Sequence, residues 1–155
     1  MHSFLKSISI LFVIILLSCQ DKPSEEAVAF DSKMKETIQI HDDVMPKMSE
    51  INSLISQLEA KKAELEEAEE LDQEQINLLD LTITNLKEAH DLMMSWMKNF
   101  SNTFSRSEIN DGLTTTDMDS IKAKLKTLEA QYKSAESMKE AIIQSVENAK
   151  TILAE

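Results

Sequence analysis

The amino-acid sequence predicts an all-α protein that folds as an elongated antiparallel three-helix bundle with coiled-coil-like packing. Two observations predict this fold. The chain of 155 residues contains one glycine and two prolines, so it lacks the turn residues that a sheet with many reversals needs. Its apolar residues recur alternately three and four positions apart over long stretches, which is typical of helices that pack along a seam.

The first 18 residues have the composition of a secretory signal peptide. Lys6 provides a positive charge near the start, and an apolar run follows from Ile8 to Leu17. About ten residues make about 15 Å of helix, roughly half the thickness of a hydrocarbon core of about 30 Å. We therefore expect residues 1–18 to be removed, and a short permanent anchor helix is the alternative.

The four residues that end this leader, LLSC, are similar to the lipobox of bacterial lipoproteins. The resemblance implies that Cys19 is lipidated and anchors the mature protein to a membrane of the cell envelope, on the periplasmic face or the cell surface. Cys19 is the single cysteine, so no disulfide can form within the mature chain. Residues 19–24 are polar and include Pro23, which favours a tether ahead of a helical domain of residues 25–154.

The first predicted helix contains Pro46. Proline lacks an N–H group, and its ring clashes with the carbonyl group of Asp42, so we expect a kink at this point. A four-helix bundle, in which residues 25–44 fold back, is the alternative. The seam positions of this helix are Phe30, Met34, Ile38, His41, Met45, Met48, Ile51, Ile55, Leu58 and Leu65.

Two further helices follow. Asp72 in the stretch ELDQEQ suits the N-cap of the second helix, with Gln75 three residues later. Gly112 in SRSEINDGLTTTD supplies flexible backbone at the second break, where Thr116 or Asp117 can cap the third helix. The seam of the second helix comprises Ile76, Leu79, Ile83, Leu86, His90, Met93, Met97, Phe100 and Phe104. The seam of the third comprises Met118, Ile121, Leu125, Leu128, Tyr132, Ala135, Ile142, Val146, Ala149 and Leu153.

The helix register follows from the two breaks. If the first two helices reverse about Leu71, the numbers of two facing residues add up to about 142. For the second and third helices, the numbers of two facing residues add up to about 221. Segments 38–70, 72–104 and 117–149 then form a bundle about 50 Å long. Residues 24–37 extend past its end and leave Phe30 and Met34 without partners. Either residues 105–115 cover them, or an unknown protein partner or second copy of this chain binds through residues 25–37.

Charge and motifs exclude several classes of function. The formal net charge of −12 repels phosphate backbones and anionic lipid, so we expect no nucleic-acid partner. No G-x-S-x-G, phosphate-binding loop, H-E-x-x-H or C-x-x-C motif occurs. The dipeptides His41-Asp42 and His90-Asp91 resemble the metal-binding pair of HD phosphohydrolases, but the chain has too few of the further ligands that such sites need. We expect a non-enzymatic protein.

The stretches HDDVMPKM and HDLMMSWM each set a histidine and two methionines at positions i, i+4 and i+7, which share one face of a helix. The register places Met45 level with Met97 and Met48 level with Met94, with a histidine about one turn beyond each end. Thioether and imidazole groups are ligands for Cu(I) or Ag(I), and methionine suits an oxidising compartment. The candidate metal ligands are His41, Met45, Met48, His90, Met94 and Met97.

Other interpretations of these stretches remain open. Methionine is a common core residue, so a purely structural or protein-interaction module without metal is the main alternative. The histidines are harder to explain by packing, because a buried imidazole without a partner is costly. Haem held by histidine and methionine is a third interpretation, and such a haem would be non-covalent because C-x-x-C-H is absent.

Two resemblances bear on these stretches. The ligand set is similar to that of periplasmic copper-handling proteins, in which histidine and methionines, sometimes beside a tryptophan, hold Cu(I); Trp96 stands next to Met97 here. HDDVMPKM, MMSWMKNF and the LLSC box together are also similar to a family of small helical bacterial lipoproteins, some of which carry the label viral A-type inclusion protein. That second resemblance implies a helical lipoprotein and no particular activity.

Overall fold

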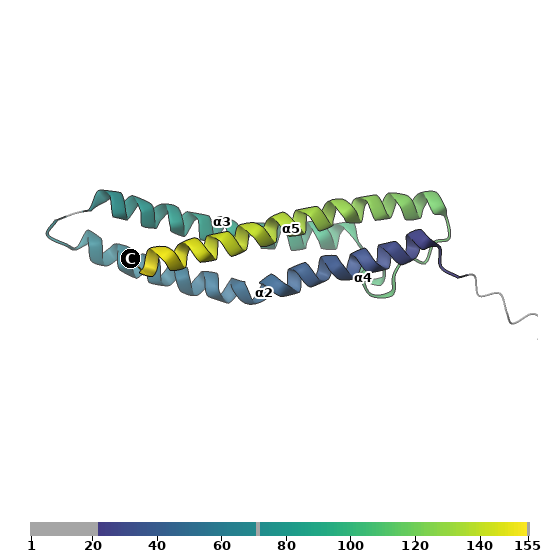
Figure 1. The fold of residues 1–155 in the computed structure, drawn as a ribbon, viewed down its shortest axis with the longest axis horizontal. Helices are drawn as coiled ribbons and strands as arrows, with labels where there is room; N and C mark the ends of the chain where they lie inside the picture. Colours follow the sequence, from purple (N-terminus) through teal and green to yellow (C-terminus); the bar gives the residue numbers. More distant parts are fainter. Residues whose placement is uncertain (1–21, 71, 155) are drawn as a thin grey trace, which may run out of the picture.

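The computed structural model describes residues 22–70 and 72–154. These residues form four helices, namely α2 (Glu25–Glu66), α3 (Gln73–Thr103), α4 (Arg106–Asp111) and α5 (Met118–Ala154) (Figure 1). They contain no strand, so the all-α fold class is confirmed. The predicted signal peptide (residues 1–18), Cys19 and the next two residues of the tether lie outside the described residues.

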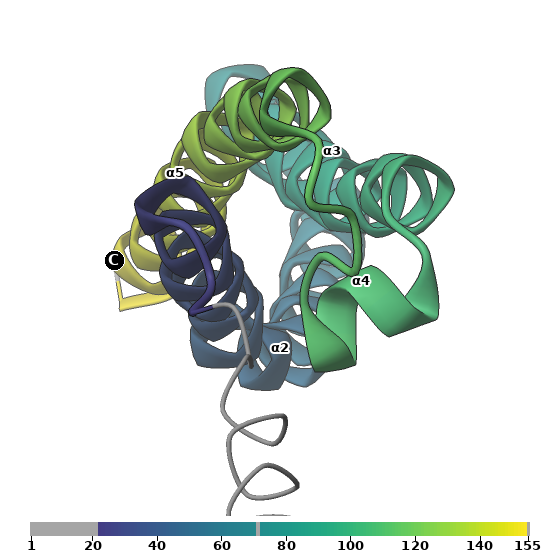
Figure 2. The ribbon, with the colours of Figure 1, turned by 90° about the vertical axis from the view of Figure 1, so that its right-hand side faces the viewer.

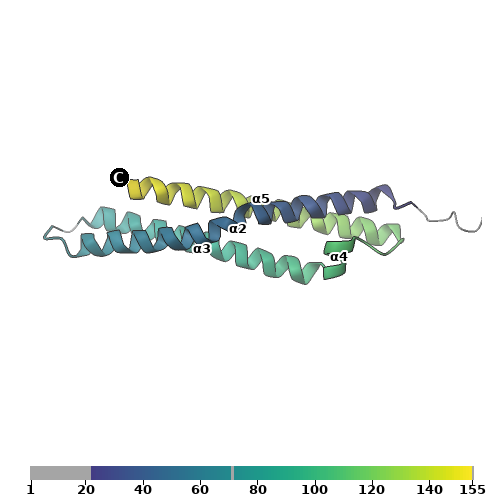
Figure 3. The same ribbon diagram turned by 90° about the horizontal axis from the view of Figure 1, so that it is seen from below.

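The three long helices form an elongated bundle. α2 and α5 run in the same direction, and α3 runs antiparallel to both (Figures 1 and 3). Figure 2 shows the three helices around a common axis, with α4 at the end of the bundle where α2 begins. In the described part of the chain, no helix combines the length and the apolar composition that crossing a membrane requires.

α2 is one helix of 42 residues that continues through Pro46. Its direction changes near its middle, as Figures 1 and 3 both show. Bending at a proline separates its ring from the carbonyl group four residues earlier, and Pro46 lies on the exposed side of the helix. The predicted kink is confirmed, and the four-helix alternative, with residues 25–44 folded back, is wrong.

The breaks between helices are built as the sequence predicts. Asp72 accepts a hydrogen bond from the backbone N–H of Gln75 at 3.0 Å, and Asp117 accepts one from the N–H of Ser120 at 3.0 Å. Both side chains thus cap helices, because they satisfy N–H groups that have no partner within the helix. Gly112 has a φ of 82°, a backbone conformation that other residues rarely adopt.

The predicted register is right for one pair of helices and wrong for the other. Lys62 of α2 pairs with Asp80 of α3 at 2.6 Å, as the register of the first two helices predicts. The indole N–H of Trp96 donates to the carbonyl oxygen of Gln131 on α5 at 3.3 Å, whereas the prediction placed Trp96 level with residue 125. α5 is therefore shifted by more than one turn relative to α3.

This shift has a cause in the connection between α3 and α5. The prediction treated that connection as a simple reversal, but it contains α4, and α5 begins beyond the end of α3. α5 therefore packs along α2 from its first turn onward, where Lys122 lies 3.9 Å from Glu26 and Lys139 pairs with Asp43 at 3.0 Å. The bundle extends to the start of α2 rather than ending near residue 38.

The same arrangement covers the two side chains that had no predicted partner. Phe30 is fully buried and Met34 nearly so, and the Phe30 ring meets the Phe104 ring edge-on at 5.9 Å. Ile109 of α4 and Leu113 pack against the same core. Residues 105–115 thus cover the start of α2, which was the first of the two predicted solutions. Phe30 and Met34, whose lack of predicted contacts suggested a partner at residues 25–37, therefore have contacts within the chain.

Polar contacts hold α5 against α2 along the outside of the bundle. Lys150 of α5 donates to Glu50 of α2, and this hydrogen bond, together with one from Lys47, lowers the pKa of the Glu50 carboxyl group. The Lys61 ammonium group donates to the carbonyl oxygen of Ile152 at 3.0 Å, which satisfies an acceptor in the last turn of α5.

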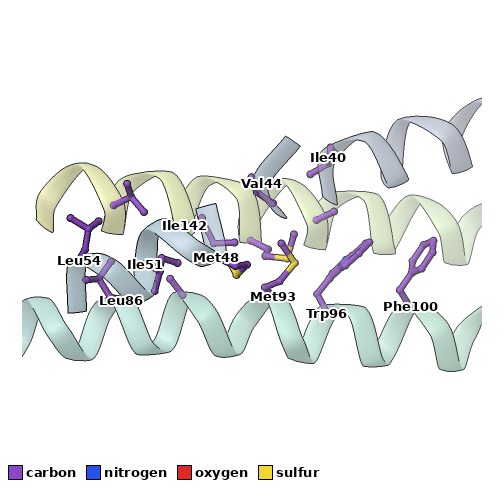
Figure 4. Close-up of a cluster of buried hydrophobic side chains, with 14 of the residues drawn as sticks. Ile40, Val44, Met48, Ile51, Leu54, Leu86, Met93, Trp96, Phe100 and Ile142 are labelled. Carbon is purple, nitrogen blue, oxygen red and sulfur yellow. The ribbon is translucent and has the colours of Figure 1, made fainter. Parts of the chain in front are cut away.

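The core runs continuously along the bundle and includes side chains from all three long helices. Figure 4 shows its middle, where Ile51 and Leu54 of α2 lie beside Leu86 of α3. Two buried hydroxyl groups, those of Thr37 and Thr82, donate to backbone carbonyl groups of their own helices at 2.7 Å. Among the described residues, no buried side-chain nitrogen or oxygen lacks a hydrogen-bond partner.

Candidate metal-binding site

A groove of about 440 Å³ lies between α2 and α3, about one to two helical turns before the kink at Pro46. α2 contributes one wall, and the other residues come from α3. The groove is mostly apolar and opens to solvent. Its lining residues are Ile38, His41, Met94, Trp96, Met97, Lys98, Phe100 and Ser101.

His41 is the central polar group of this groove. Its ring atom Nε2 lies 3.2 Å from the sulfur atom of Met97, which belongs to the facing helix. Its other nitrogen, Nδ1, lies 2.9 Å from a carboxylate oxygen of Asp42. The ring stacks on Trp96, with centroids 5.8 Å apart and planes inclined by 24°. The imidazole is therefore held at both nitrogens and on one face.

Trp96 and Phe100 form a rigid wall behind this imidazole. They stand four residues apart on α3, so they share one face of the helix, and their rings stack at 4.8 Å. Phe104 continues the row at 5.2 Å from Phe100 and meets the buried Phe30 ring. The hydrogen bond from the Trp96 indole to Gln131 fixes this row to α5. The wall is part of the core, which limits the movement of the His41 ring.

Met94 and Met97 supply two thioether groups to the same groove. They stand three residues apart on α3 and so lie on one side of that helix. Met97 is half-buried against the core, and Met94 is 39% exposed. The groove thus presents one imidazole and two thioethers from two helices, a set of ligands that prefers soft cations. Lys98 lies at its edge and contributes a positive charge.

The structure separates the other three predicted ligands from this groove. Met45 is 41% exposed and does not line it. Met48 is 8% exposed and points into the core near Met93, as Figure 4 shows. His90 lines a different groove with Asn52, Ile55, Lys87 and Asp91. Of the six candidate ligands, the structure brings His41, Met94 and Met97 together at one groove and places Met45, Met48 and His90 elsewhere.

This separation follows from which residues face the core. Adjacent residues on a helix point about 100° apart. Val44 and Met93 are the fully buried positions at this level, so the residues that follow them, Met45 and Met94, turn outward. The spacing puts the histidine and methionines of each stretch on one face of their own helix. It does not determine whether the two faces point toward each other.

Sequence reasoning missed two contributors to the groove. The sequence indicates Trp96 only as a neighbour of Met97 and Phe100 only as a seam residue, yet both form the wall against which His41 lies. Their spacing of four residues is a signal that could have indicated a shared face. Asp42 stands in a His-Asp dipeptide, and that spacing alone does not predict its contact with His41.

Within residues 22–70 and 72–154, no three side chains of the types His, Cys, Asp and Glu gather in a way that could hold a metal ion. Comparison with protein-family models, with curated proteins and with solved structures finds no match to this chain.

Proposed function

We propose that this chain is a non-enzymatic, lipid-anchored helical protein of the cell envelope that binds one soft monovalent cation, Cu(I) or Ag(I). His41, Met94 and Met97 would hold the ion in the groove between α2 and α3. The observation that carries the proposal is the approach of the His41 Nε2 atom to the Met97 sulfur at 3.2 Å across two helices.

This contact is poorly explained by packing alone. A thioether sulfur accepts hydrogen bonds only weakly, so it is a poor partner for a half-buried imidazole nitrogen. Both atoms carry electron pairs that can bind a soft cation, and an ion between them would satisfy both. The two helices already bring these ligands together, so binding would require only small side-chain movements.

The remaining features of the groove agree with a soft ion. It contains no carboxylate among its lining residues, whereas hard cations prefer oxygen ligands. Thioethers also bind Cu(I) where a thiol would be oxidised, and the lipobox-like LLSC sequence implies that the only cysteine is lipidated in an oxidising compartment. The aromatic wall excludes water on one side, and the exposed Met94 leaves the other side open for the ion to enter and leave.

A competition titration tests the proposal directly. The full-length chain carrying Cys19→Ser, which removes the only thiol, would be titrated in detergent micelles against a weak Cu(I) chelator under reducing conditions. We expect it to take about one equivalent of Cu(I) from the chelator. Failure to take any metal from a weak chelator would contradict the proposal.

Two matched pairs of substitutions locate the site. Met94→Leu with Met97→Leu should abolish binding, because both thioethers are lost. Met45→Leu with Met48→Leu should leave binding unchanged, because neither side chain lines the groove. Methionine and leucine have similar volumes, so all variants should keep their helical circular-dichroism spectra. Equal loss of affinity in both pairs would contradict the assignment to this groove.

The second candidate function is a protein-interaction module without metal. One observation favours it, namely that Leu78, Leu81 and Leu92 on α3 are exposed by 40, 58 and 47%. Exposed leucines on one helix are typical of surfaces that bind other proteins, although scattered ones are common. The titration separates the two candidates, because an interaction module has no reason to take Cu(I) from a chelator.

A further inference from the structure

We propose that Asp42 is a positioning residue for this site: it keeps the proton of the His41 ring on Nδ1, so that the Nε2 electron pair faces Met97 and receives a monovalent cation. The inference rests on the proposed function and names the residue that prepares its nitrogen ligand.

The contact between the two side chains determines where the proton lies. An ionised carboxylate can only accept hydrogen bonds, so the 2.9 Å contact between His41 Nδ1 and Asp42 Oδ1 requires a proton on Nδ1. In the neutral imidazole, the other nitrogen then carries a free electron pair. That nitrogen is the one that lies 3.2 Å from the Met97 sulfur. Metal-binding histidines commonly have such a carboxylate on the nitrogen that does not bind metal.

Trp96 prevents the ring from exchanging its two nitrogens. The stacked indole covers one face of His41 and is itself fixed by its hydrogen bond to Gln131. Rotation of the imidazole by half a turn would have to displace this wall. Asp42 and Trp96 together therefore keep one nitrogen toward the solvent side and the other toward the sulfur atom.

The second His-Asp dipeptide of the chain lacks this arrangement. His90 Nδ1 lies 3.6 Å from Asp91 Oδ1, too far for a hydrogen bond, and the Asp91 side chain is 82% exposed. The groove that His90 lines contains no sulfur atom and no aromatic ring. The same two residues thus occur twice, and only the first copy has a prepared nitrogen ligand.

Charge also points to a monovalent ion. The neutral imidazole and two thioethers bring no charge, and Asp42 is the carboxylate that contacts the ligand set. One positive charge on the ion would balance the negative charge of the Asp42 carboxylate. A divalent ion would bring one more charge beside apolar side chains, and Lys98, which lines the groove, would repel it more strongly than a monovalent ion.

The ring nitrogens report on this inference without any metal. Two-bond ¹⁵N–¹H spectra of the metal-free full-length chain, recorded over a series of pH values, distinguish a proton on Nδ1 from a proton on Nε2. In the unsubstituted chain, we expect the His41 ring to carry its proton on Nδ1. In Asp42→Ala, we expect a larger population of rings with the proton on Nε2. An identical distribution in both proteins would overturn the inference.

Affinity for Ag(I) provides the second readout. In the Cys19→Ser background, Asp42→Ala should bind Ag(I) about 10-fold to 100-fold more weakly, whereas the matched control Asp91→Ala should bind as the parent does. Both positions are exposed and helical, where alanine is favourable, so both variants should fold. Equal affinities of the two variants would overturn the inference. A parent chain that binds no Ag(I) would contradict the proposed function instead, and the ring spectra would still decide the role of Asp42.

Discussion

Replacing Cys19 by alanine is expected to leave an unprocessed precursor that takes up no labelled fatty acid. Cys19 ends the apolar leader and is the only cysteine, so no other residue can replace it at the LLSC box. Because the lipid would be attached through the Cys19 sulfur atom, its loss should abolish labelling completely rather than reduce it. Metabolic labelling with a fatty acid and the size of the product on a gel measure it.

Met45→Leu is the control for this experiment, because it changes an exposed side chain 26 residues after Cys19 in the sequence. It should be processed and labelled as the unsubstituted chain is. Normal processing and labelling of Cys19→Ala would show that the lipobox-like sequence is not used.

Lipid attachment at Cys19 would also orient the bundle. α2 begins six residues after Cys19, at the end of the bundle where α4 lies (Figure 1). The turn between α2 and α3 would then point away from the membrane. His41 would lie about 24 Å along α2 from its first residue, so the groove would be accessible from the aqueous compartment.

Replacing Leu86 by alanine is expected to lower the free energy of unfolding by about 2–5 kcal/mol. Leu86 is fully buried at the middle of the core, where Ile51 and Leu54 of α2 lie beside it (Figure 4). Truncation removes its apolar contacts and leaves a cavity, since surrounding helices relax only partly. Urea denaturation followed by circular dichroism measures the change.

Leu81→Ala provides the matched control on the same helix. Leu81 is 58% exposed, so its truncation should change the free energy of unfolding by no more than about 0.5 kcal/mol. A similar loss of stability in both variants would contradict the assignment of Leu86 to the core.

The sequence was sufficient for the fold class and for the ends of the helices. Scarcity of glycine and proline, together with three-four alternation, indicates long helices, and the caps at Asp72 and Asp117 follow from local hydrogen bonding. The kink at Pro46 follows from the chemistry of proline alone. These features depend on residues close together in the chain, which is why single-sequence reasoning finds them.

The position of α5 could not be predicted in the same way. It depends on how the connection from Phe104 to Asp117 folds, and that connection forms α4 and packs Ile109 against the core. Tertiary contacts of this kind decide the register between helices. The contact between Phe30 and Phe104, and the burial of Met34, follow from that register.

The sequence predicted three of the residues at the candidate site, His41, Met94 and Met97, together with three that lie elsewhere. Tertiary contacts again explain the difference. Spacing shows which residues share a helix face, but the orientation of that face depends on which neighbours fill the core. Val44 and Met93 fill it, so Met45 turns to solvent, whereas His41 and Met97 meet at the edge of the seam. The contact of His41 with Asp42 depends on side-chain conformations that no sequence pattern specifies.

X-ray absorption at the copper edge tests the central claim most directly. The full-length Cys19→Ser chain would be loaded with Cu(I) at one equivalent or less and measured in its reduced state. We predict a first coordination shell that contains sulfur atoms and one imidazole nitrogen, as His41, Met94 and Met97 would supply. A shell of oxygen and nitrogen atoms without sulfur, or copper that does not remain bound to the chain, would contradict the proposed site.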